Sequence, residues 1–282
     1  MATKVVRKRK NPSMNLRRNN TPKATNLGDE VHSLANRQSS ALLSSLSHIR
    51  VFAIRRPKPE CVTKENWLVF NVTSTTKEQW CKEFSPFFLG PIELYPNETD
   101  GTMYTAKNME NAWQFAKVYK KFTGQNEQPN DEYWKWARDG WNDSKPHRFP
   151  FGRTAEKPLY SLWKGEKLTY IQARKRIYAP LYAKYVEQTD AYKKLSEIYL
   201  KYCCGDKNDK QTRPMALLDF DGWDYLGQGY QLEQTINLPK PKMGHAFVIV
   251  GLLENNLFWL DQPEKNRIEH LRSTGRLLKD IQ

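Results

Sequence analysis

Apolar and polar residues alternate in two short segments near the start of the folded part of the chain. The run Ile49-Arg50-Val51-Phe52-Ala53-Ile54 predicts a strand, and 67–72 predicts a second one. Further along, residues 215–224 are expected to run from a buried strand into an acidic turn. The segment 244–253 is apolar throughout, which fits a buried helix or a buried strand.

Helical spacing is clearest at 108–122, where Met109, Ala112, Trp113 and Ala116 recur at i, i+3, i+4 and i+7. A second helix is predicted at 131–141. A long helical stretch is predicted at 168–202, and it should bend near Pro180 because proline removes a backbone donor.

These patterns predict a mainly α protein with a few short β-strands, an α+β fold with one folded domain. The expected boundaries are a disordered basic arm at 1–47, the domain at 48–260 and a peripheral charged segment at 261–282.

Charge changes this picture mainly at the N-terminus. The chain of 282 residues has a net charge of +14, and eight basic residues precede Asp29 without one acidic residue. The arm could be a nuclear address, a nucleic-acid-binding element or a solubilising tail. The candidate contacts to nucleic acid are Arg7, Lys8, Arg9, Lys10, Arg17 and Arg18.

No apolar run is long enough for a membrane span, and the basic N-terminus has no hydrophobic region of a secretory signal. We therefore expect no membrane partner and an intracellular location, cytoplasmic or, in a eukaryotic host, nuclear. Phosphate-binding and dinucleotide glycine loops, nucleophile elbows and zinc-binding His motifs are missing from the sequence. The five histidines are widely separated and the four cysteines have no zinc spacing, so no metal site is predicted.

The acidic turn is one candidate site. Asp219, Asp221 and Asp224 lie within six residues, where they could raise one another's pKa or hold a hard cation such as Mg²⁺. Gly227 and Gly229 follow, and they would let the backbone approach a ligand closely. The alternative is a solvated turn in which the aspartates cap backbone N–H groups.

Glu110 is the second candidate. It lies one residue from the apolar stripe of the predicted 108–122 helix, and Gln114 and Lys117 follow it at spacings of four and three. A carboxylate beside a ring such as Trp113 is partly desolvated, which raises its pKa and suits proton transfer. The alternative is an ordinary glutamate on a helix face, paired with Gln114 or Lys117.

The segment 147–153 is the third candidate. Arg148 and Arg153, with Phe149 and Phe151 between them, could clamp a pyrophosphate while a ring stacks on a base. The alternative is a surface loop.

Taken in order, these segments resemble the NADAR family, the YbiA-like domain linked to NAD and ADP-ribose. The resemblance extends from Ser85 to Glu254. It is carried by Phe84-Ser85-Pro86-Phe87, Glu110-Asn111-Ala112-Trp113-Gln114-Phe115-Ala116-Lys117, Gly152-Arg153, the 168–202 helix, Asp224-Tyr225-Leu226-Gly227-Gln228-Gly229 and the 244–253 segment. Pro86 stands where the family usually has Asn, and Leu226 where it has Trp, which is typical of a divergent branch, viral, phage or fungal.

The resemblance implies hydrolysis of an N-glycosidic bond at a ribose, in ADP-ribosylated guanine or in a phosphoribosylated intermediate, without a cofactor. It implies Glu110 as the catalytic carboxylate, with Asp224 or Asp221 holding the ribose hydroxyls or the water. Lys117 and Arg153 would bind phosphate, Trp113 or Phe87 would wall the base, and Gln114, Gly227 and Gly229 would complete the substrate site. Two other functions stay open. One is a non-enzymatic nucleic-acid-binding or virion protein that uses the arm, and the other is an inactive module that binds ADP-ribose.

Overall fold

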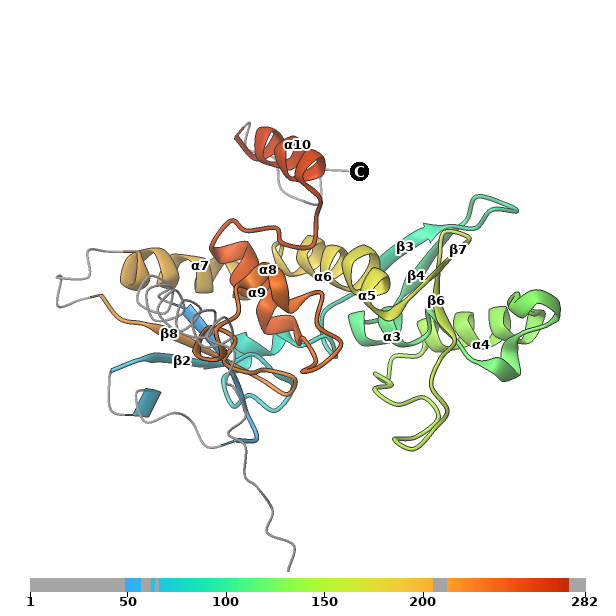
Figure 1. The fold of residues 1–282 in the computed structure, drawn as a ribbon, viewed down its shortest axis with the longest axis horizontal. Coiled ribbons are helices and arrows are strands. Elements are labelled where there is room, and N and C mark those ends of the chain that lie inside the picture. Colours follow the sequence, from blue (N-terminus) through green and yellow to red (C-terminus); the bar gives the residue numbers. More distant parts are fainter. Residues whose placement is uncertain (1–48, 57–61, 64–65, 205–211, 274–282) are drawn as a thin grey trace, which may run out of the picture.

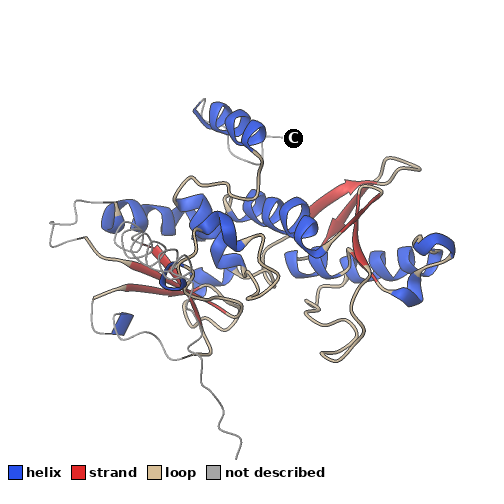
Figure 2. Cartoon of the chain, in the orientation of Figure 1, coloured by secondary structure: helices blue, strands red, loops and turns tan. Residues whose placement is uncertain are grey.

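The computed structural model describes residues 49–56, 62–63, 66–204 and 212–273, and it has a mixed α+β fold, as the sequence predicts. Helices surround three small sheets (Figure 2). The predicted arm and the end of the C-terminal segment lie outside these residues. Within the described part, every helix is too short or too polar to cross a lipid bilayer.

The first sheet is parallel and has β8 in the middle. Strand β1 (Ile49–Ala53) and strand β2 (Leu68–Asn71) flank β8 (Met215–Asp219), giving the order β1-β8-β2. All five residues of β8 are buried, as expected for the central strand of a parallel sheet. Asp219, at the carboxyl end of this strand, lines the candidate site.

The remaining strands form two antiparallel sheets at the opposite end of the long axis (Figure 1). One sheet pairs β3 (Ile92–Pro96) with β4 (Met103–Ala106). The other has the order β5-β6-β7, made by Lys117–Val118, Tyr160–Trp163 and Glu166–Leu168. The helix α4 (Asp131–Asn142), which the sequence predicts, lies at this end of the molecule.

Helix α9 (His245–Leu253) lies against the parallel sheet. Residues 245–252 are all buried, because α9 packs against β1 and β8 and also against α6 (Ala179–Val186). A helix that is apolar on every face belongs in the interior, so the 244–253 segment is a core helix. The other helices and 3₁₀ turns are η1 (Gln79–Phe84), η2 (Lys120–Phe122), η3 (Gln125–Glu127), α7 (Asp190–Cys203), η5 (Leu226–Gln228), α8 (Leu232–Thr235) and α10 (Gln262–Ser273).

The helix predicted at 108–122 is much shorter than expected. Helix α3 spans Met109–Gln114, with the side chain of Asn108 accepting a hydrogen bond from the N–H of Asn111 at its start. It ends there because the next residues join a sheet: Lys117 pairs with Ser161, and the N–H of Leu162 donates to the carbonyl of Ala116 at 2.7 Å. Strand pairing therefore overrides the helical spacing of the sequence.

The predicted long helix at 168–202 is three helices. Helix α5 (Tyr170–Ala173) continues through a π-helical turn, Arg174–Tyr178, into α6, and α7 begins anew after Thr189 caps it. Pro180 lies in the first turn of α6, directly after the π-helical turn. The predicted bend itself stays a prediction; beside Pro180 the structure has the π-helical turn, whose extra residue is a common cause of helix kinks.

Gly140, on α4, lies against the ring of Phe115, and a Cβ at this position would collide with the ring carbons. We expect Gly140→Ala to lower the free energy of unfolding by about 1–3 kcal/mol through overpacking. That loss outweighs the gain of about 0.5–1 kcal/mol from alanine's better helix propensity. Urea unfolding measures the change. Gly124→Ala is the control because nothing lies within 4 Å of its added Cβ, and equal stability of the two variants would contradict the packing.

Candidate active site

A cavity of about 350 Å³ lies between the parallel sheet, α3 and the loop 148–158, within the size range of small-molecule sites. Aromatic rings, cations and carboxylates all contribute to its walls. The rings are Phe87, Trp113, Tyr119, Phe149, Phe151, Tyr170, Tyr178 and Phe220. The charged residues are Glu110, Lys117, Arg148, Arg153, Glu156, Lys157, Arg174, Asp219, Asp221 and Lys242, and His245 lies beside them.

Glu110 is positioned by the start of α3. Its N–H donates to the carbonyl of Pro86 at 2.9 Å, which ties the helix to the aromatic loop 84–91. The side chain is buried, and its Oε1 accepts a hydrogen bond from Nε2 of Gln114 at 2.8 Å. Burial raises the pKa of Glu110, while the hydrogen bond from Gln114 and the positive charges of Lys117, Arg148 and His245 oppose this rise. The result is a carboxyl group that can exchange protons closer to neutral pH than an exposed glutamate.

Lys117 completes a short chain of side chains that begins at Glu110. Its Nζ donates to Oε1 of Gln114 at 2.6 Å and lies 4.9 Å from the centre of the Trp113 ring. Gln114 therefore bridges a carboxylate and an ammonium group, which fixes the orientation of its amide. Burial lowers the pKa of Lys117 to about 8; Glu110 opposes this shift, and the nearby charge of Lys242 adds to it.

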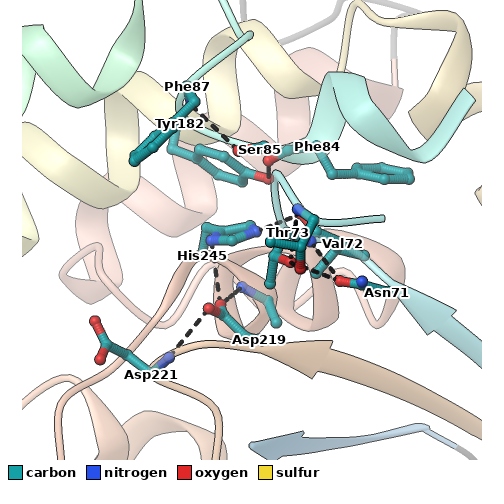
Figure 3. A network of polar contacts seen from close by, with 12 residues as sticks. Asn71, Val72, Thr73, Phe84, Ser85, Phe87, Tyr182, Asp219, Asp221 and His245 are labelled. Carbon is teal, nitrogen blue, oxygen red and sulfur yellow. Dashed lines mark hydrogen bonds and ion pairs between the residues drawn. The ribbon is translucent and has the colours of Figure 1, made fainter. Parts of the chain in front are cut away.

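Asp219 and His245 lie where β8 ends and α9 begins (Figure 3). Oδ2 of Asp219 accepts a hydrogen bond from the N–H of Ala246 at 2.9 Å and lies 3.2 Å from Nδ1 of His245. Nε2 of His245 is 2.8 Å from the carbonyl of Val72, at the end of β2. The Asp219 carboxylate also lies against the backbone of residue 244. Glycine is needed there, because a Cβ would collide with this carboxylate. The pair joins β2, β8 and α9 at the cavity wall.

The loop 148–158 forms the opposite wall. Nη2 of Arg148 lies 3.3 Å from Oδ2 of Asp221, and its guanidinium lies over the ring of Phe220 at 5.3 Å. The segment that precedes this loop is fixed by the buried side chain of Asn111 on α3. This side chain accepts a hydrogen bond from the N–H of His147 and donates to the carbonyls of Asp143 and Lys145. Helix α3 therefore positions both the buried carboxylate and the cationic loop.

Seven of the ten catalytic and substrate-binding residues predicted from the sequence meet in this cavity. They are Glu110, Asp221, Phe87, Trp113, Gln114, Lys117 and Arg153. The six basic residues of the arm lie outside the described part of the chain.

Asp224, Gly227 and Gly229 do not line the cavity, and this corrects the prediction that Asp224 meets Glu110 there. The carboxylate of Asp224 pairs with the guanidinium of Arg50 on β1, where Nε donates to Oδ1 at 3.0 Å, and it also accepts the N–H of Gly227. A Cβ on Gly227 would collide with this carboxylate, and Gly229 has φ +82° after the 3₁₀ turn η5. Both glycines are therefore explained by the turn itself.

The structure adds cavity residues that the sequence prediction missed, chiefly His245, Arg174 and Lys242. Two of them carried a signal. His245 is a polar residue directly before an apolar run. Arg174 lies three residues after Ile171 and four before Tyr178, so helical spacing places it on the same face as these two apolar residues. Lys242 carried none, because it lies in a loop.

Among the described residues, no three His, Cys, Asp or Glu side chains are grouped as metal ligands. Compared with protein-family models, with curated proteins and with solved structures, the chain has no match. A function for the cavity therefore has to be inferred from its geometry and from the residues that line it.

Proposed function

We propose that this protein is a hydrolase that cleaves the N-glycosidic bond of an ADP-ribosyl or phosphoribosyl substrate. The observation that carries the proposal is the buried Glu110 carboxylate, set in a cavity that offers both aromatic rings and cations. A phosphorylated nucleoside derivative has the matching parts, since its base can pack on rings and its phosphates can pair with cations. Four residues of the motif 110–117, which resembles that of the NADAR family, line this cavity: Glu110, Trp113, Gln114 and Lys117.

Aromatic rings and cations in the cavity wall would bind different parts of such a substrate. Trp113 and Phe87 line the cavity near Glu110 and would hold the base, while Lys117 and Arg153 would pair with phosphate. Gln114 would orient the Glu110 carboxylate through the hydrogen bond that it already donates. Asp221, at the cavity wall, takes the role of binding the ribose hydroxyls or the water, in place of Asp224.

The chemistry needs one carboxylate and one water. As the bond from C1′ to the base nitrogen breaks, its electron pair leaves with the base and positive charge develops on the ribose ring. The ionised Glu110 stabilises this charge and accepts a proton from the attacking water, whose oxygen forms the new bond to C1′. General base catalysis of this kind contributes about 10²–10⁴-fold to the rate.

The pH dependence of kcat/KM should have two limbs. Activity needs ionised Glu110, so it is lost as the pH falls through the raised pKa of this residue, above the ordinary glutamate range. Phosphate binding needs protonated Lys117, so it is lost as the pH rises through about 8. Lys117→Arg keeps its charge at all of these pH values, so it should remove the alkaline limb. A limb that stays near 8 in this variant would rule Lys117 out as its cause.

The direct test incubates the full chain with ADP-ribosylated guanosine and follows free ADP-ribose by mass spectrometry. Release of ADP-ribose together with unmodified guanosine supports the proposal, because it shows that the bond between the base and the ADP-ribosyl group breaks. Binding of ADP-ribose without turnover of any ribosyl substrate would favour the inactive binding module. If the chain does not bind ADP-ribose and releases no product from an ADP-ribosylated or a phosphoribosylated substrate, the hydrolase proposal fails, and the non-enzymatic nucleic-acid-binding or virion role is favoured.

A further inference from the structure

Three of the cations that line the cavity have no salt bridge in the described part of the chain. Lys117 donates to the neutral amide of Gln114, and Glu110 acts on it only as a nearby charge. Arg174 and Lys242 line the same cavity. By contrast, Arg148 on the opposite wall already has a carboxylate partner in Asp221.

Arg174 is the most unusual of the three because it is a buried cation. It is 2% exposed, and it lies in the π-helical turn between α5 and α6. Its Nη1 donates to the carbonyls of Thr235, Ile236 and Leu238 at 2.9–3.2 Å, and its guanidinium lies 4.6 Å from the centre of the Tyr170 ring. Its Nη2 is buried and has no hydrogen-bond partner among the described residues. A buried donor without an acceptor is costly, and it often marks the place of an absent ion or ligand.

Lys242 supplies the exposed cation of this group. It lies two residues before Gly244, in the loop that leads into α9, and it lines the cavity near enough to Lys117 for the two charges to act on each other. Two ammonium groups that repel each other in a partly closed cavity are stabilised when an anion binds between them.

We propose that Lys117, Arg174 and Lys242 form an anion site that binds a phosphoryl group of a phosphorylated ligand. A phosphoryl group has several terminal oxygens that accept charge-assisted hydrogen bonds, which suits three cationic side chains that line one cavity from separate segments. This anion site rests on the proposed function for the kind of ligand. It deepens that function because it names the residues that receive a phosphate. Arg153 on the facing wall is then free to contact a second part of the ligand.

Calorimetric titration of the full chain with ADP-ribose, AMP and adenosine tests the site without any turnover. Lys242→Gln should weaken the binding of ADP-ribose and AMP by about tenfold or more, as expected when a charged donor is lost, and should leave adenosine unchanged. The matched control is Lys240→Gln, in the same loop, because Lys240 is exposed and does not line the cavity. Arg174→Lys, checked for folding by thermal melting, should weaken the same two ligands.

Unchanged binding of AMP and ADP-ribose by Lys242→Gln would overturn the anion site, as would equal losses in Lys240→Gln. The two proposals fail separately. A wild-type protein that binds these ligands through Lys242 but releases no product keeps the site and removes the hydrolase. An active wild-type protein whose KM does not change in Lys242→Gln keeps the hydrolase and removes the site.

Discussion

Glu110→Gln lowers kcat/KM for an ADP-ribosylated substrate by about 10²–10⁴-fold, if the buried carboxylate acts as the general base. The amide has nearly the same shape and keeps an oxygen for the hydrogen bond from Gln114. It is neutral, so it neither stabilises a developing positive charge nor accepts the proton of water. Because burial raises the pKa of Glu110, the ionised carboxylate costs folding free energy, and the variant should be at least as stable as the wild type.

Product release followed by mass spectrometry gives the rate, and thermal melting gives the stability. Glu132→Gln, an exposed glutamate on α4 that does not line the cavity, is the control and should retain the wild-type rate. Equal rates for Glu110→Gln and the wild type would remove Glu110 from the mechanism. A slow variant with a lowered melting temperature would instead point to a structural role.

Asp219→Ala should lower the free energy of unfolding by about 2–6 kcal/mol, because it leaves two buried groups without their partner, at about 1–3 kcal/mol each. The side chain is 2% exposed, and its removal leaves His245 and the N–H of Ala246 without their acceptor in the interior. Asp221→Ala is the matched control in the same turn. Its ion pair with Arg148 is partly exposed, so its loss should cost about 1 kcal/mol or less.

Chemical unfolding of both variants measures this difference. Losses of similar size would show that the contacts of Asp219 with β2 and α9 do not stabilise the fold. A loss of stability in Asp219→Ala alone would show that Asp219 stabilises the fold. Asp221 would then line the cavity without a comparable structural role.

The local elements were predictable where burial and backbone pairing agree. Strands β1 and β8 and the helix α4 follow the pattern of apolar residues, and the helix predicted at 108–122 has the expected first limit, at Asn108. The second limit is wrong because Lys117 and Val118 pair with Tyr160 and Ser161, some forty residues away, and nothing within 108–122 encodes that partner.

The site was predictable to the same degree. Glu110, Gln114 and Lys117 keep their neighbourhood although the helix ends early, because Gln114 bonds to both of the others. Asp224 was misplaced because its partner is Arg50, 174 residues earlier in the chain. Asp219 and Asp221 line the cavity and Asp224 does not, and this difference depends on such distant contacts rather than on the spacing of the three aspartates in the sequence.

The order of strands in the parallel sheet has a consequence for how the chain is made. Among the strands that the structure describes, β1 and β2 pair with β8 and not with each other. Some 150 residues of the chain separate these two strands from β8. During synthesis the two early strands have left the ribosome long before their shared partner is translated. Their open edges must stay unpaired until Met215–Asp219 emerges, so expression should depend strongly on chaperones and on the speed of translation.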